Sequence, residues 1–109
     1  MSPKEIFEEY LVEQLLKRKA SLRNINAIYQ FVITGPSGGK WFLDLTADPP
    51  FVKLGINPAP HCIVTIKDDD LLAVVVGELD GIKAFMIGKL QVQGDIGLAM
   101  RLPDIFQNS

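Results

Sequence analysis

The sequence predicts an α+β fold, in which helices cover one face of a five-stranded, mainly antiparallel sheet. Three observations favour this fold. An amphipathic helical pattern opens the chain, short strand patterns separated by turns follow, and helical patterns return towards the C-terminus. The chain has 109 residues, of which 48% are hydrophobic, and this suffices for one core. We therefore expect residues 1–109 to form a single domain.

The first helix should begin at Ser2. Ser2 and Glu5 have the spacing of a capping box, and Pro3 suits the first helical position. Apolar residues then recur at helical spacing as far as Leu15, and the helix should end in the basic run 17–19. This basic end is either a solvated helix terminus, the commoner case, or a transient contact for the anionic headgroups of a membrane.

A hairpin should follow, with strands over residues 27–34 and 40–46. In its second strand Trp41, Leu43 and Leu45 share one face, so we expect them to face the helices while Asp44 points away. The first strand is apolar on both faces and should therefore be central in the sheet. We assign one of its faces, with Ile28 and Val32, to the side covered by helices.

Residues 48–60 hold four of the seven prolines, so 51–54 can form only a short edge strand. Another strand should cover 61–66, and a helix should start at Asp68, Asp69 and Asp70. Three carboxylates at a helix start usually cap it, whereas a calcium site spreads its ligands along a loop. We expect no metal here.

A short helix, a strand and a last helix should occupy residues 80–102. Asp80 suits an N-cap, and Ile82, Phe85 and Met86 fall on one helical face, which we expect to be buried. Gly88 can end this helix in the left-handed conformation. The strand 89–93 follows, and Asp95 can cap a helix that carries apolar residues as far as Leu102.

Little in the sequence supports catalysis, a cofactor or nucleic-acid binding. The only histidine, His61, precedes the only cysteine, Cys62, and neighbours on a strand point to opposite faces. One His and one Cys cannot form a zinc site either. The net charge of −2 gives no reason to expect nucleic acid as a partner. We therefore expect a protein that is not an enzyme and has no cofactor.

Three segments together resemble the sterol carrier protein type 2 family of lipid-binding domains. They are GPSGGKWFLDL at 35–45, CIVTIKDDDLLAVVVGEL at 62–79 and GKLQVQGDIGLAMRL at 88–102. The resemblance covers roughly residues 22–102. It implies the strand order 3-2-1-4-5 and non-catalytic binding of an apolar lipid, such as a fatty acid, acyl-CoA or sterol, in a cavity between the sheet and the C-terminal helices.

Composition alone favours a filled core at this place, and only the resemblance implies a cavity. The methionines suit changing contacts slightly better than a rigid core. Gln30 is a candidate polar anchor, and Gln93 a weaker one because it lies opposite in parity to Leu90. The expected ligand-binding residues are Ile28, Gln30, Val32, Trp41, Leu43, Phe85, Met86, Leu90, Ile96, Ala99, Met100 and Leu102.

Two other functions remain open: a protein-interaction module, in which the Tyr29, Phe31 and Ile33 face forms a homodimer or binds another protein, and an accessory domain that presents a lipid substrate to a partner enzyme. After Pro103 only six residues follow, so either the cavity mouth is open or Ile105 and Phe106 plug it. The single cysteine, an acidic start unlike a signal peptide, and an ending unlike the peroxisomal Ser-Lys-Leu lead us to expect a cytoplasmic protein.

Overall fold

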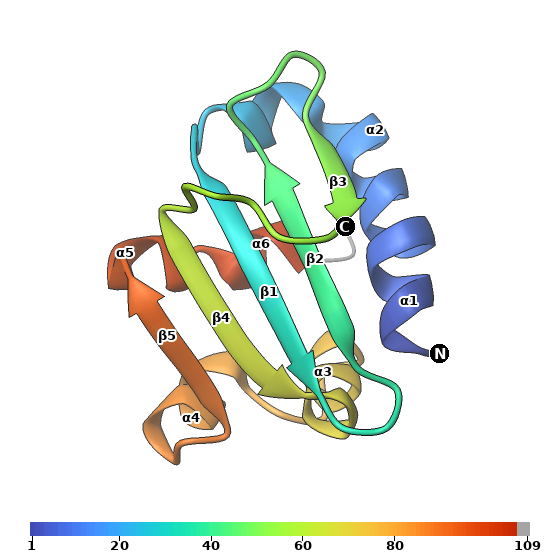
Figure 1. Ribbon diagram of the computed structural model, residues 1–109, viewed down its shortest axis with the longest axis vertical. Coiled ribbons are helices and arrows are strands. Elements are labelled where there is room, and N and C mark those ends of the chain that lie inside the picture. Colours follow the sequence, from blue (N-terminus) through green and yellow to red (C-terminus); the bar gives the residue numbers. More distant parts are fainter. Residues whose placement is uncertain (107–109) are drawn as a thin grey trace.

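One mixed five-stranded sheet, in the order β3-β2-β1-β4-β5, forms the centre of the computed structural model, which describes residues 1–106 (Figure 1). The α+β fold and the strand order are as the sequence predicts. Neighbouring strands are antiparallel except β1 and β4, which run parallel. The ending Gln107–Ser109 lies outside the described residues. The strands are β1 (Ile28–Thr34), β2 (Gly39–Asp44), β3 (Phe51–Leu54), β4 (Cys62–Lys67) and β5 (Leu90–Gly94).

The helices lie behind and beside the sheet in Figure 1, and the face towards the viewer carries none. The N-terminal helical segment comprises α1 (Pro3–Glu5), the π-helical η1 (Ile6–Tyr10) and α2 (Leu11–Arg23). The later helices are α3 (Asp68–Val75), α4 (Gly81–Met86), α5 (Ile96–Ala99) and α6 (Leu102–Phe106). No helix among residues 1–106 is long and apolar enough to cross a lipid bilayer.

Several helix ends have the predicted caps. Ser2 and Glu5 form the capping box, and the Asp80 carboxylate accepts hydrogen bonds from the backbone N–H groups of Ile82 and Lys83. Gly88 follows α4 with a φ of +81°, a conformation that glycine adopts without strain. These local signals therefore fix where the chain turns.

The register of β1 against β2 decides which residues face the helices. Tyr29 pairs with Leu43 and Phe31 with Trp41, so these four side chains share one face. The prediction for Trp41, Leu43 and Leu45 is confirmed, because all three are buried, whereas Asp44 lies on the other face and is half-buried.

The prediction of which β1 side chains face the helices was wrong, because the true alternation is displaced by one residue. Ile28 and Val32 pair with Asp44 and Lys40, so they lie on the face without helices. The face of Tyr29, Phe31 and Ile33 is buried in the core, which leaves it unable to form the dimer interface considered above. The physical reason is that both faces of β1 are apolar, so alternation alone does not fix the parity.

Gln30 is buried on the sheet face opposite the helices, so it is no anchor for a ligand between the sheet and the helices. Its amide donates hydrogen bonds to the carbonyls of Trp41 (3.1 Å) and Gly55 (3.0 Å) and accepts one from the N–H of Asn57 (2.7 Å). The loop after β3, which crosses the front of the sheet in Figure 1, is thereby fastened over β1. The role of Gln30 is structural.

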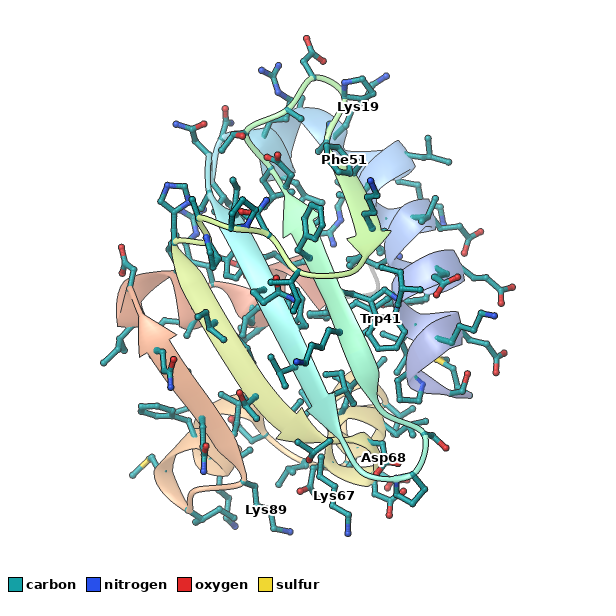
Figure 2. All side chains as sticks on the ribbon, in the orientation of Figure 1. Lys19, Trp41, Phe51, Lys67, Asp68 and Lys89 are labelled. Carbon is teal, nitrogen blue, oxygen red and sulfur yellow. The ribbon has the colours of Figure 1, made fainter. Side chains whose placement is uncertain are left out.

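A buried carboxylate, Asp68, fastens the β1–β2 turn to the start of α3, as Figure 2 shows beside the turn. It accepts hydrogen bonds from the N–H groups of Ser37 (2.9 Å) and Asp69 (2.8 Å). Among residues 1–106, no group of three or more acidic, histidine or cysteine side chains is placed to hold a metal ion.

The core has two halves behind the sheet. The N-terminal helical segment covers β2, where the Phe7 ring stacks on Trp41 at 4.9 Å between centroids and Glu8 accepts a hydrogen bond from the Trp41 indole (3.0 Å). This half is filled by aromatic side chains. The other half, behind β4 and β5, belongs to α3–α6 and contains the candidate site.

Candidate functional site

An apolar cavity of about 640 Å³ lies between the sheet and helices α3–α6. Its volume falls within the range of roughly 300–1,000 Å³ that is typical of small-molecule sites. The lining residues come from three strands, four helices and the α3–α4 connection. They are Phe31, Val64, Ile66, Leu71, Val74, Val75, Gly77, Leu79, Asp80, Gly81, Ile82, Phe85, Leu90, Val92, Ile96, Ala99, Met100, Leu102, Pro103 and Phe106.

The sheet provides a flat apolar wall. Phe31, Val64 and Val92 lie side by side across β1, β4 and β5, and Ile66 pairs with Leu90 one step along the same face. Alternation along each strand places these side chains behind the sheet, while their neighbours point to the front. The sheet wall of the cavity therefore follows directly from strand register.

Two short helices, α4 and α5, lie at the two ends of β5 (Figure 1) and both contribute residues to the cavity lining. In α4, Phe85 is 37% exposed, and in α5, Ile96 and Met100 at its C-terminal cap are 54% and 51% exposed. Each of these side chains lines the cavity while part of it contacts solvent. These exposed apolar side chains mark the mouth of the cavity.

Helix α6 forms the wall at the other end, nearest the N-terminal helical segment. Leu102, Pro103 and Phe106 line the cavity, and the Phe106 ring also contacts Phe7 and Phe31 edge-on. Ile105 is fully buried. The sequence leaves open whether the cavity mouth is open or plugged by Ile105 and Phe106. In the structure the cavity is partly open at its rim, and Phe106 contributes to a wall.

The lining offers little acid–base chemistry. Asp80 is its only ionisable residue among residues 1–106, and this carboxylate is exposed and already caps α4. His61 has a structural role, because its Nδ1 accepts a hydrogen bond from the N–H of Ile28 (2.9 Å). The cavity is therefore suited to an apolar molecule rather than to proton transfer or covalent chemistry.

Two further ionisable groups, Tyr29 and Cys62, lie on the same sheet face but outside the lining. Burial raises the pKa of the Tyr29 hydroxyl, which donates a hydrogen bond to the carbonyl of Leu98 (2.7 Å). Burial, and secondarily the Asp95 carboxylate, raises the pKa of the Cys62 thiol to about 11. A thiol in this state is a poor nucleophile at neutral pH.

Half of the predicted site residues line the cavity: Phe85, Leu90, Ile96, Ala99, Met100 and Leu102. Trp41 and Leu43 face the helices, but the N-terminal helical segment fills the space behind them. Ile28, Gln30 and Val32 lie on the opposite face, as does the weaker candidate Gln93.

Met86 was also placed wrongly. It is 77% exposed and does not line the cavity, since Ala84 is the residue that α4 buries. The six-residue helix has too few turns to bury the whole face of Ile82, Phe85 and Met86 at the end of the sheet.

Strand β4 and helix α3 contribute lining residues that are absent from the predicted site, chiefly Val64, Ile66 and Val75. The alternation of Cys62, Val64 and Ile66 contains the necessary signal, since these residues share the covered face. Phe31 and Phe106 line the cavity but are absent from the predicted site residues, for different reasons. Phe31 was omitted because the parity of β1 was assigned wrongly. The position of Phe106 depends on where a short C-terminal segment packs.

The fold and the cavity define a small α+β domain with a preformed apolar site between sheet and helices. The model of the SCP-2 sterol transfer family matches residues 7–107. The chain therefore belongs to this family, as its sequence motifs suggest.

Individual relatives agree with this assignment. Hydroxysteroid dehydrogenase-like protein 2 of Xenopus laevis is 36% identical over 86% of this chain and 22% of its own length. Non-specific lipid-transfer protein-like 1 of Caenorhabditis elegans is 30% identical over 92% of this chain and 86% of its own length. Sterol carrier protein 2 of Aedes aegypti, solved in complex with palmitate, is 25% identical and superposes with a TM-score of 0.71 over 97% of this chain and 96% of that one.

The chain spans about a fifth of the length of the Xenopus laevis relative. Relatives of this family thus include proteins much longer than this chain as well as proteins of about its size.

Proposed function

We propose that residues 1–109 act as one lipid-binding domain, which holds an acyl chain in the cavity between the sheet and α3–α6. The observation that supports this most is the cavity itself, about 640 Å³ and lined almost entirely by apolar side chains. The Aedes aegypti relative was solved with a palmitate ligand, and a saturated chain of this kind matches such a lining.

Removal of apolar surface from water would drive binding. Each methylene group that leaves water contributes about 0.8 kcal/mol, so the driving force grows with every methylene that the cavity encloses. The cavity offers no buried charged partner for a headgroup among residues 1–106. We infer that the headgroup stays at the rim near α4 and α5, and that selectivity for headgroups is loose.

We further propose that the domain carries its ligand without chemical change. The only ionisable side chain of the described lining, Asp80, is committed to capping α4. A nucleophile or general acid would need to reach the ligand from the lining, and Cys62 and His61 do not belong to it.

Displacement of a fluorescent fatty acid by palmitate tests the proposal, with two matched variants. Val64→Phe should fill the cavity with an aromatic ring and lower palmitate affinity at least tenfold, an effect worth about 1.4 kcal/mol. Ile63→Phe places the same ring one residue earlier, on the face without helices, and should bind like the wild type.

Thermal melts of both variants show whether the fold survives. A wild-type protein that does not bind palmitate or related lipids contradicts the proposal. So does a folded Val64→Phe variant that binds as the wild type does. Val92→Phe, from the neighbouring strand and the same cavity wall, replaces Val64→Phe if the latter does not fold.

A further inference from the structure

We propose that Phe106 sets the longest acyl chain that the cavity accepts. This inference rests on the proposed function, because it concerns how far a bound chain reaches. A ligand whose headgroup stays at the rim, near Phe85 and Met100, extends inwards along the sheet wall. Phe106 lies in the wall on the side of the N-terminal helical segment, where the chain's methyl end would arrive.

The Phe106 ring lies where the cavity meets the aromatic side chains behind β2. It lines the cavity together with Phe31, and it also contacts Phe7, which stacks on Trp41 outside the lining. Its centroid lies 5.8 Å from that of Phe31 and 6.2 Å from that of Phe7, with interplanar angles of 84° and 86°. Phe7 and Phe31 are buried, so the side chains that the Phe106 ring contacts are apolar and shielded from water.

The α6 backbone that carries the ring is held by the N-terminal helical segment. The Tyr10 hydroxyl donates a hydrogen bond to the carbonyl of Phe106 (2.8 Å). The Arg18 guanidinium donates to the carbonyls of Asp104 (2.6 Å) and Ile105 (2.8 Å), which the short helix cannot satisfy itself. These hydrogen bonds hold the α6 backbone, and the edge-on contacts with Phe7 and Phe31 limit rotation of the ring, so the ring acts as a stop.

Such a stop has a measurable consequence for a series of fatty acids. Affinity should rise about fourfold for each added methylene while the chain still finds apolar lining. The rise should end when the methyl end reaches Phe106, because further methylenes must remain at the rim in water. A smaller side chain at residue 106 should move this end point to longer acids.

The test compares dissociation constants for decanoate, laurate, myristate, palmitate, stearate and arachidate in the wild type, Phe106→Leu and Phe106→Ala. Both variants should continue the fourfold rise to longer acids than the wild type, and Phe106→Ala further than Phe106→Leu. Ile105→Val is the matched control, because this buried neighbour in α6 does not line the cavity. It should leave the end point unchanged.

Phe106→Leu retains a large apolar side chain, so it keeps the test informative if Phe106→Ala does not fold. Identical chain-length profiles in the wild type and a folded Phe106→Leu variant would overturn the inference. So would an equal shift in Ile105→Val, since that result would indicate general loosening of α6. Failure of the wild type to bind any acid of the series would instead contradict the proposed function.

Discussion

Substitution of Met100 by glutamate should weaken lipid binding while leaving the domain folded. Met100 lines the rim of the cavity and is 51% exposed. Burying a whole methionine side chain is worth about 1.5–3 kcal/mol, so the loss of this half-buried one should cost about 1 kcal/mol of stability. That cost lies within the usual effect of a single substitution.

The effect on binding should be larger. An acyl chain against residue 100 would remove the new carboxylate from water without a compensating partner, which costs more than the roughly 1–3 kcal/mol of a neutral polar group. We therefore expect Met100→Glu to lower palmitate affinity by at least roughly tenfold at neutral pH. Affinity should recover partly in acid, because the neutral carboxyl group is easier to desolvate.

Met86→Glu is the matched control for this experiment. It introduces the same charge on the neighbouring helix α4, but Met86 is 77% exposed and lies outside the lining. Displacement of a fluorescent fatty acid and thermal melts should be measured on the same preparations. Normal binding by Met100→Glu, or an equal loss in Met86→Glu, would refute the assignment of residue 100 to the rim of the site.

Three further predictions concern stability. Gly35→Ala should lower the free energy of unfolding by about 1–3 kcal/mol in urea denaturation, because its φ of +97° strains an alanine and the added Cβ would overlap the Asp68 carboxylate; an unchanged midpoint would contradict this. Asp80→Ala removes the cap of α4 and should lower the free energy of unfolding by about 1 kcal/mol in the same assay. An unchanged free energy of unfolding would contradict this role of the cap. In the unfolded chain the Cys62 thiol has its ordinary pKa of 9.0, whereas burial and the Asp95 carboxylate raise its pKa to about 11 in the folded protein. The free energy of unfolding should therefore fall as pH rises between these two values, and it should fall less in Cys62→Ala. Identical pH profiles for the two proteins would contradict this prediction.

Much of the fold could be predicted because local signals and the global arrangement agree. The capping box of Ser2 and Glu5, the Asp80 cap and the Gly88 stop set the helix boundaries where the sequence places them. In β2 a charged Asp44 between Leu43 and Leu45 marks the face that points away from the helices, and the structure follows it.

The parity of β1 could not be predicted in the same way. Ile28 and Val32 resemble core residues as closely as Phe31 does, because a central strand is largely covered on both faces. Which face of β1 points to the helices is determined by its pairing with β2 and by the loop that Gln30 holds against the front of the sheet. Both depend on contacts between residues far apart in the sequence.

The site was predictable only in its C-terminal half. Residues such as Ile96, Ala99 and Met100 are apolar at helical spacing, and the family motif covers them. The share of α4 was overestimated, because spacing does not reveal that a six-residue helix at the end of a sheet leaves Met86 in solvent. The wall formed by Phe106 depends on contacts with the N-terminal helical segment.

The central claim is that an acyl chain lies between the sheet and α3–α6. Isotope-filtered NOE spectroscopy of labelled protein with palmitate tests it most directly, because it reports which side chains lie within a few ångströms of the ligand. We expect NOEs from the acyl chain to Val64, Ile66 and Ala99, and none to Val32 and Ile63 on the opposite face of the sheet. NOEs to Val32 and Ile63, or bound palmitate without NOEs to the cavity lining, would contradict it.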